Sequence, residues 1–222
     1  ITKLNAEVID GLTGQIAFAE KQYKKAIPLL SKYYDKLPTS RNIVLLASAY
    51  KGVGNTAKAV DKLEQHISKA SQDLFAQQLL ANYYLELDTN KAIASYEKLS
   101  KASGEKNVIA LNNLAYLFLE RGDTAKALAY SKKAFDLAPN VANVLDTYGM
   151  SLLKSGDKRQ ALKILKDAIE MSNNKTLEMQ LNYVEALIAN GRFNNAKEVI
   201  AGLSGNEVTS NKRYQTLSAQ LK

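Results

Sequence analysis

The chain has no cysteine and no tryptophan, one histidine and only three prolines among its 222 residues. Without cysteine, a disulfide framework and a thiolate metal site are both excluded. His66, the only histidine, has no second histidine with which to hold a metal ion, and we expect it to be an ordinary surface residue near the end of a helix. No apolar run approaches the length of about 18 residues that a membrane-spanning helix needs.

Catalytic motifs are missing as well. The sequence contains no H-x-E, G-x-S-x-G or G-x-x-x-x-G-K-[ST] pattern. The one Gly-Glu-Lys stretch, at 104–106, follows a helical pattern and not a strand, so it does not resemble a phosphate-binding loop. We therefore predict that the chain is not an enzyme and that it has no catalytic residues, no cofactor and no metal site.

What the sequence has in abundance is one repeated turn. "LERGDTAKAL", at 119–128, has near-copies in "YKGVGNTAKAV", "LLKSGDKRQAL" and "LIANGRFNNAK". The glycines of these turns are Gly54, Gly122, Gly156 and Gly191, separated by 68, 34 and 35 residues. A period of about 34 residues with one double step indicates a repeat protein and predicts a further turn near Asp88. One step before Gly54 lies another turn, near Glu20.

The period divides the chain into six copies and a remainder. Each copy is predicted to form two amphipathic helices around the turn, which we call its first and second helix. The hydrophobic content of 46% is enough for their apolar faces to form a substantial core. In the fourth copy, Gly122 suits a left-handed helix end and Asp123 suits the N-cap of the next helix. The predicted copies are 7–39, 40–73, 74–107, 108–141, 142–176 and 177–210, and one closing helix is predicted at 211–222.

Small residues recur at two positions of the repeat. We expect both positions to lie where helices cross too closely for larger side chains. One position is held by alanine in every copy: Ala26, Ala59, Ala92, Ala127, Ala161 and Ala196. The other is held by Gly14, Ala47, Ala81, Ala115 and Gly149.

These positions resemble the tetratricopeptide repeat, whose pattern runs from a large apolar residue through a small one, a turn glycine and an alanine to a closing proline. The fourth copy supplies Leu114, Ala115, Phe118, Gly122, Ala127, Ala134 and Pro139, whereas the fifth has Asn173 in place of the proline. The resemblance implies an all-α fold. It would be a right-handed α-superhelix, or solenoid, of about six helix-turn-helix hairpins with a C-terminal capping helix, in a single domain of residues 1–222.

The resemblance also implies that the first helices line a concave groove and that the groove binds a peptide segment or partner protein. The amide side chains on this surface can donate and accept hydrogen bonds, and its Tyr and Met side chains supply apolar anchors. The alternative is that the side chains of this surface are ordinary solvated residues on exposed helix faces. The predicted groove residues are Gln78, Asn82, Asn112, Asn113, Tyr116, Asn143, Asp146 and Met150, with Thr147, Glu178, Asn182 and Glu185 on the same face.

Some tetratricopeptide domains clamp the C-terminal carboxylate of chaperone tails with two Lys, two Asn and an Arg. Asn82 and Asn113 fall at the two Asn positions of that clamp. Its cationic positions hold Gln78, Asn143 and Thr147, which would leave a buried carboxylate without a counter-charge. We therefore predict that the chain does not bind chaperone tails in this way.

The net charge of +8 allows an anionic partner without requiring one. Lysines come as singles and pairs, mostly on second helices and near acidic residues, and we read pairs such as Lys132–Lys133 and Lys212–Arg213 as solvated faces. Aromatic residues do not alternate with them, as a nucleic-acid surface would require. Protein binding thus ranks first. The alternatives are binding of nucleic acid or another anionic polymer, and assembly as one module of a longer superhelix.

A narrower resemblance joins the fourth and fifth copies to bacterial tetratricopeptide lipoproteins of exopolysaccharide and PEP-CTERM protein-sorting systems. The residues that carry it are "ALNNLAYLFLERGD" and "LAPNVANVLDTYGMSLLKSGD". It implies a place in the cell envelope or periplasm rather than the cytoplasm. The signal peptide and the lipid-anchored cysteine would then precede Ile1.

Overall fold

The structure is a computed structural model that describes residues 6–172 and 176–222. Ile1, and Asn173 at the position of the closing proline in the fifth copy, lie outside the described residues. The described residues form fourteen α-helices and no β-strand. The first six helices are α1 (Ala6–Ala19), α2 (Tyr23–Lys36), α3 (Ser40–Gly52), α4 (Thr56–Lys69), α5 (Leu74–Leu87) and α6 (Thr89–Ala102). The others are α7 (Val108–Glu120), α8 (Thr124–Leu137), α9 (Ala142–Ser155), α10 (Lys158–Met171), α11 (Leu177–Ala189), α12 (Phe193–Gly202), α13 (Asn206–Ser210) and α14 (Lys212–Ala219).

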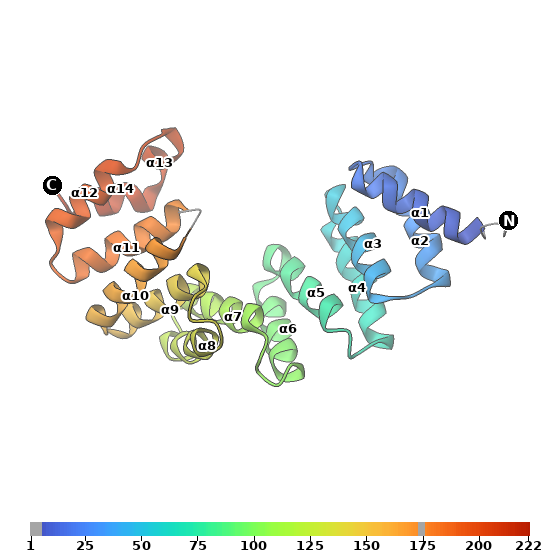
Figure 1. The fold of residues 1–222 in the computed structure, drawn as a ribbon, viewed down its shortest axis with the longest axis horizontal. Coiled ribbons are helices and arrows are strands. Elements are labelled where there is room, and N and C mark those ends of the chain that lie inside the picture. Colours follow the sequence, from blue (N-terminus) through green and yellow to red (C-terminus); the bar gives the residue numbers. More distant parts are fainter. Residues whose placement is uncertain (1–5, 173–175) are drawn as a thin grey trace. The chain divides into compact units, whose positions relative to one another are not determined.

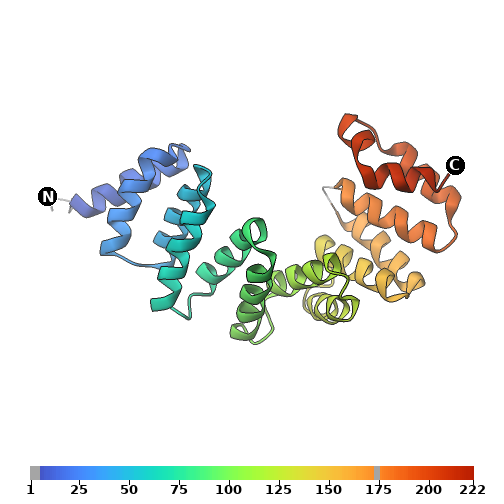
Figure 2. The same ribbon diagram turned by 180° about the vertical axis from the view of Figure 1, so that it is seen from behind.

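The helices group into two compact units, which are described separately. Unit 1 spans residues 1–105 and contains α1 to α6, and unit 2 spans residues 106–222 and contains α7 to α14. In unit 1 each helix packs against the next along the chain, and in unit 2 the same holds from α7 to α12, as Figures 1 and 2 show. First helices of successive hairpins also touch, as in the contact of α7 with α9. This is the nearest-neighbour packing of an α-solenoid.

The repeated turn has one hydrogen-bonding pattern. The backbone N–H of Asp123 donates to the carbonyl of Phe118 at 2.9 Å, and equivalent bonds close the turns at Gln22, Asn55, Asp157 and Arg192. Gly122 adopts a φ of 74°, a left-handed conformation that glycine reaches without strain. Asp123 then caps α8 by accepting from the N–H of Lys126, which confirms both predicted roles.

The turn predicted near Asp88 is present but shorter than the others. α5 ends at Leu87 and α6 begins at Thr89, so Asp88 alone connects them. Its carboxylate accepts hydrogen bonds from the N–H groups of Asn90 and Lys91. Because Asp88 adopts an extended backbone conformation, this turn needs no glycine.

The recurrent small residues are buried as predicted. All six alanines of the second helices, from Ala26 to Ala196, have 0% of their surface exposed. At the other position, a Cβ atom added to Gly149 would come within 2.5 Å of the Leu165 side chain. Any larger residue there would force α9 and α10 apart, so the sequence period reflects close helix crossings.

The expectation that His66 lies on the surface is wrong. His66 is only 3% exposed and lies between Tyr34 and Asp73. Its Nδ1 is 2.7 Å from the hydroxyl of Tyr34 on α2, and its Nε2 is 2.9 Å from the Asp73 carboxylate that caps α5. Ser40 of α3 donates to the same carboxylate. The residue therefore joins four helices of unit 1 through a buried polar network.

The C-terminal end of unit 2 is closed by α14, which packs against α11 and α12. Leu217 and Leu221 are buried there in a cluster with Leu181, Val184 and Ile200. The closing helix predicted at 211–222 is thus present as Lys212–Ala219. The short α13 before it is not predicted by the repeat pattern. Among the described residues, no helix is both long and apolar enough to cross a membrane.

Candidate functional site

A pocket of about 510 Å³ lies on the first helices of unit 2. Its walls come from α7, α9 and α11, and α14 contributes one side chain. The lining residues are Tyr116, Leu119, Glu120, Asp146, Thr147, Met150, Lys154, Glu178, Asn182, Glu185 and Arg213.

Helix geometry explains why these residues meet. Residues four apart lie on one face of a helix, so α9 presents Asp146, Met150 and Lys154 in a single stripe. Tyr116 and Glu120 form the corresponding stripe on α7. Because α7 packs on α9 and α9 packs on α11, the stripes of the three first helices lie next to one another.

Tyr116 gives the pocket an accessible aromatic ring. The structure describes all twelve tyrosines of the chain, and Tyr116 alone is exposed, with 53% of its surface accessible. Partial burial and the negative charges of Glu120 and Glu178 raise the pKa of its hydroxyl. Leu119 and the buried Met150 add apolar surface beside the ring.

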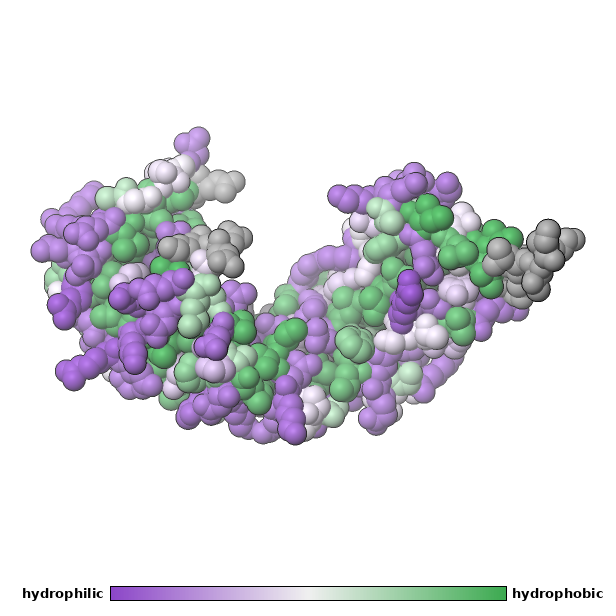
Figure 3. Space-filling view, in the orientation of Figure 1, coloured by the Kyte–Doolittle hydropathy of each residue, from purple (hydrophilic) through white to green (hydrophobic). Residues whose placement is uncertain are grey.

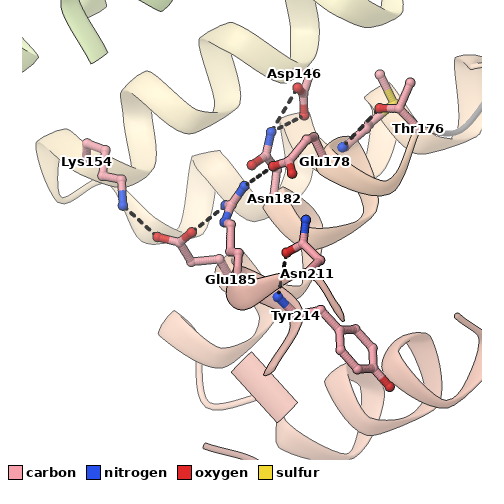
Figure 4. A network of polar contacts seen from close by, with 10 residues as sticks. Asp146, Lys154, Thr176, Glu178, Asn182, Glu185, Asn211 and Tyr214 are labelled. Atoms are coloured by element: carbon pink, nitrogen blue, oxygen red, sulfur yellow. Dashed lines mark hydrogen bonds and ion pairs between the residues drawn. The ribbon is translucent and has the colours of Figure 1, made fainter. Parts of the chain in front are cut away.

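Arg213 of α14 forms two ion pairs at one side of the pocket. Its guanidinium lies 2.9 Å from Glu178 and 2.6 Å from Glu185, two carboxylates of α11. Glu185 also pairs with Lys154 of α9 at 2.6 Å (Figure 4). Burial alone would raise the pKa of the Glu185 carboxyl, but hydrogen bonds and charges from the two cations outweigh burial and lower it.

Asp146 is held by an amide side chain, whereas Glu185 is held by two cations. Both of its carboxylate oxygens accept from the side-chain amide of Asn182, at 3.0 and 2.9 Å (Figure 4). Burial raises the pKa of Asp146, and the Asn182 hydrogen bonds and the charge of Arg213 only partly offset it. Within the described part of the chain, Asp146 and Glu120 form no ion pair.

The charge of the pocket is opposite to that of the whole chain. Four carboxylates and two cations line it, a formal charge of −2, whereas the chain carries +8. Low-dielectric walls strengthen such a local field. An anionic ligand would meet these carboxylates, so the pocket favours neutral or cationic groups.

Three of the eight predicted groove residues, Tyr116, Asp146 and Met150, line this pocket. The lining does not include Asn112, Asn113 or Asn143. Gln78 and Asn82 belong to α5 of unit 1, where Asn82 accepts a hydrogen bond from the buried Tyr96 hydroxyl. Asn82 therefore has an internal role that the sequence did not reveal.

Leu119, Glu120, Lys154 and Arg213 also line the pocket and are not among the residues predicted from the sequence. Glu120 and Lys154 stand four residues after Tyr116 and Met150, so helical spacing could have found them. The prediction that Arg213 belongs to a solvated pair is wrong, because its guanidinium forms ion pairs with α11. Its partners lie 28 and 35 residues away, and no local pattern indicates such a contact.

Several lysines of the second helices pair with a carboxylate close by in the sequence. Lys132 pairs with Asp136 on α8, and Lys166 pairs with Glu170 on α10. Lys126 lies over the ring of the buried Phe118, 4.9 Å from its centre. Because the Phe118 ring is buried, it is not available for stacking on a base. The described residues also contain no group of His, Asp and Glu side chains placed to hold a metal ion.

Stacked helix hairpins with a capping helix define an α-solenoid repeat protein. Two family models, both described as tetratricopeptide repeat, match residues 107–174 and 152–221, and together they cover slightly more than half of the chain. The chain belongs to the tetratricopeptide repeat family. No curated protein matches it significantly in sequence.

Solved structures share its fold at low sequence identity. PilF of Pseudomonas aeruginosa is 15% identical, with a TM-score of 0.79 over 97% of this chain and 97% of PilF. PilW, a type IV pilus biogenesis factor, is 16% identical, with a TM-score of 0.74 over 97% and 99% of the two chains. A MamA structure is 18% identical, with a TM-score of 0.64 over 74% of this chain and 91% of MamA.

Proposed function

We propose that the chain is a non-catalytic scaffold that binds a peptide segment of a partner protein on the first helices of unit 2. The observation that carries this proposal is Tyr116, the one exposed tyrosine, at the edge of a 510 Å³ pocket. Tyrosine combines a large apolar ring with a polar tip and is enriched at the centre of protein interfaces. A side chain of a bound segment could pack on this ring while its backbone meets the polar groups around it.

We also place the protein in the bacterial cell envelope. The likeness in fold to PilW, a type IV pilus biogenesis factor, supports this location. A role in exopolysaccharide production or protein sorting is the more specific process that the sequence resemblance implies. The fold alone names no partner, because one architecture serves many of them.

Selection from a random 12-residue peptide display library, with the whole chain as bait, tests the scaffold function. Enriched peptides should bind the wild-type chain, and Tyr116→Ala should weaken their binding by about tenfold or more. Leu137→Ala is the matched control, because Leu137 is similarly exposed at the end of the second helix α8. Circular dichroism establishes that both variants fold. Failure to enrich any peptide, or equal binding by Tyr116→Ala, would refute the proposal.

A second candidate function is assembly through α1. Gly14 and Ala17 of α1 are buried, while Val8, Ile9, Leu12 and Ile16 are exposed on the same helix. Figure 3 shows hydrophobic surface over this helix. The outer face of α14 is polar by comparison, with Lys212 and Gln215 exposed. A polar α14 offers no apolar partner for α1. We therefore propose that α1 packs on α1 of a second copy, in a symmetric contact.

Light scattering over a range of concentrations tests this assembly. The wild-type chain should form a dimer, and Ile16→Glu should return it to a monomer because a charge cannot be buried unpaired in such a contact. Leu137→Glu, which places the same charge at an exposed position of α8, should leave the dimer intact. A wild-type chain that stays monomeric at all concentrations contradicts self-association.

A further inference from the structure

We propose that the unit 2 pocket is an arginine subsite: it receives the guanidinium of an arginine side chain of the bound peptide segment between Tyr116, Glu120 and Asp146. The inference rests on the proposed scaffold function and adds the chemistry of the partner to it. Three independent features of the pocket support it, namely its charge, an internal example of the same interaction, and its aromatic wall.

Charge complementarity is the first feature. The pocket has a formal charge of −2 in a chain of +8, so it is a local region of opposite sign. Such a region attracts a cation and repels the acidic segments that the rest of the surface would attract. Asp146 and Glu120 supply two carboxylates that no cation of the described chain neutralises by an ion pair.

Arg213 is the second feature, because it shows that this pocket already accommodates one guanidinium. Its two nitrogens reach separate carboxylates of α11, Glu178 and Glu185, at 2.9 and 2.6 Å. A guanidinium presents several donors in one plane and can bridge two carboxylates in this way. Across the same pocket, α7 and α9 provide the second pair, Glu120 and Asp146.

The third feature is the apolar wall beside that second pair. The exposed ring of Tyr116 offers a face on which a planar guanidinium can stack. Leu119 and Met150 offer surface for the methylene stem of the side chain. A free amine could use the carboxylates, but it would use neither the ring nor the apolar wall as fully. We therefore assign the pocket to arginine of a peptide and not to a small polyamine.

The test is a titration of the ¹⁵N-labelled whole chain with N-acetyl-arginine-N-methylamide, followed by amide chemical shifts. The neutral control ligand is the citrulline analogue, which has the same shape without the charge. The arginine probe should bind with a dissociation constant on the order of 1 mM and shift amides around Tyr116 and Met150. The citrulline probe should bind about tenfold more weakly or not at all.

Asp146→Asn is the informative variant, because the new amide oxygen can still accept from Asn182 and the fold is kept. This substitution should weaken binding of the arginine probe by about tenfold. Asp136→Asn is its matched control: it removes one carboxylate from unit 2 at an exposed position of α8 and should change nothing.

Equal binding of the arginine and citrulline probes, shifts outside the pocket, or equal losses in both variants would overturn the arginine subsite. Spermidine that binds as tightly as the arginine probe would also overturn it. These outcomes are distinct from failure of the scaffold function. Peptides that require Tyr116 but contain no enriched arginine would refute the subsite and leave the scaffold in place.

Discussion

The side-chain amide of Asn182 donates to both carboxylate oxygens of Asp146, at 3.0 and 2.9 Å, from the neighbouring first helix. The carboxylate is thereby fixed in position without an ion pair to a cation of the described residues, and the charge of Arg213 offsets its burial only in part. Such an arrangement costs stability, because the charged form of a buried group is penalised. A costly charge held at the wall of a pocket is typical of a functional site.

Replacing Asp146 with Asn should therefore stabilise the protein at neutral pH. The pKa of Asp146 is raised above its ordinary value of 3.8, so its contribution favours folding below that pH and is lost as the pH rises through the raised pKa. Asp146→Asn should unfold a few degrees higher than wild type at pH 7, with a difference that closes below about pH 4. Thermal melts across this pH range provide the measurement, and a lower midpoint at pH 7 argues against the assignment.

The alanine position of the second helices gives a packing prediction. Ala127 is fully buried at the crossing of α8 with its neighbours, so Ala127→Leu should overpack it and lower the free energy of unfolding by about 1–3 kcal/mol. Ala125→Leu lies two residues away on the exposed face of α8 and introduces the same side chain. Urea denaturation should show a loss for the first variant alone. Equal midpoints for the two would contradict the alignment of the repeats.

The buried network around Asp73 predicts a second loss of stability. Asp73→Ala removes the cap of α5 and the partner of His66, so the free energy of unfolding should fall by about 2–4 kcal/mol. Asp61→Ala removes an exposed carboxylate of α4 and should leave the unfolding midpoint unchanged.

The same network sets a pH dependence. Burial alone would raise the pKa of Asp73, but hydrogen bonds from the Ala76 backbone, His66 and Ser40 outweigh burial and lower it. Its stabilising contribution is therefore present above the unfolded value near 3.8 and is lost as the pH falls through the lowered pKa. Denaturation of wild type and Asp73→Ala should converge in acid. A gap that instead widens below pH 4 would exclude this role.

Arg213 links the capping helix to the pocket, and the two effects of its removal can be separated. Arg213→Gln should accelerate amide hydrogen exchange in α14, because the ion pairs with Glu178 and Glu185 are lost. It should also bind the arginine probe more tightly than wild type, because it frees two carboxylates. Lys212→Gln makes the same change of charge at an exposed neighbour and should do neither. Weaker probe binding by Arg213→Gln would contradict the charge argument.

The sequence predicted the helix pairs because their determinants are local. The turn glycines, the capping Asp123 and the alanine at each crossing recur with the period of the repeat. The resemblance to the repeat family also predicted that Tyr116, Asp146 and Met150 share one surface, and all three line one pocket in the structure.

What could not be predicted depends on contacts between distant segments. The local sequence predicts that His66 is a surface residue, but Tyr34 and Asp73, which lie in other segments of the chain, contact its two ring nitrogens. The position of Arg213 depends on how α14 folds back onto α11. Asn82 fits a ligand-facing pattern, yet it is engaged by Tyr96 of the following helix. Repeat position alone does not separate these internal roles from binding roles.

Chemical-shift mapping of a library-selected peptide on the ¹⁵N-labelled chain tests the central claim most directly. We predict that the perturbed amides cluster on α7, α9 and α11 around Tyr116, and that Tyr116→Ala abolishes the pattern. Perturbations confined to second helices or to α1, with the amides around Tyr116 unchanged, would contradict the account.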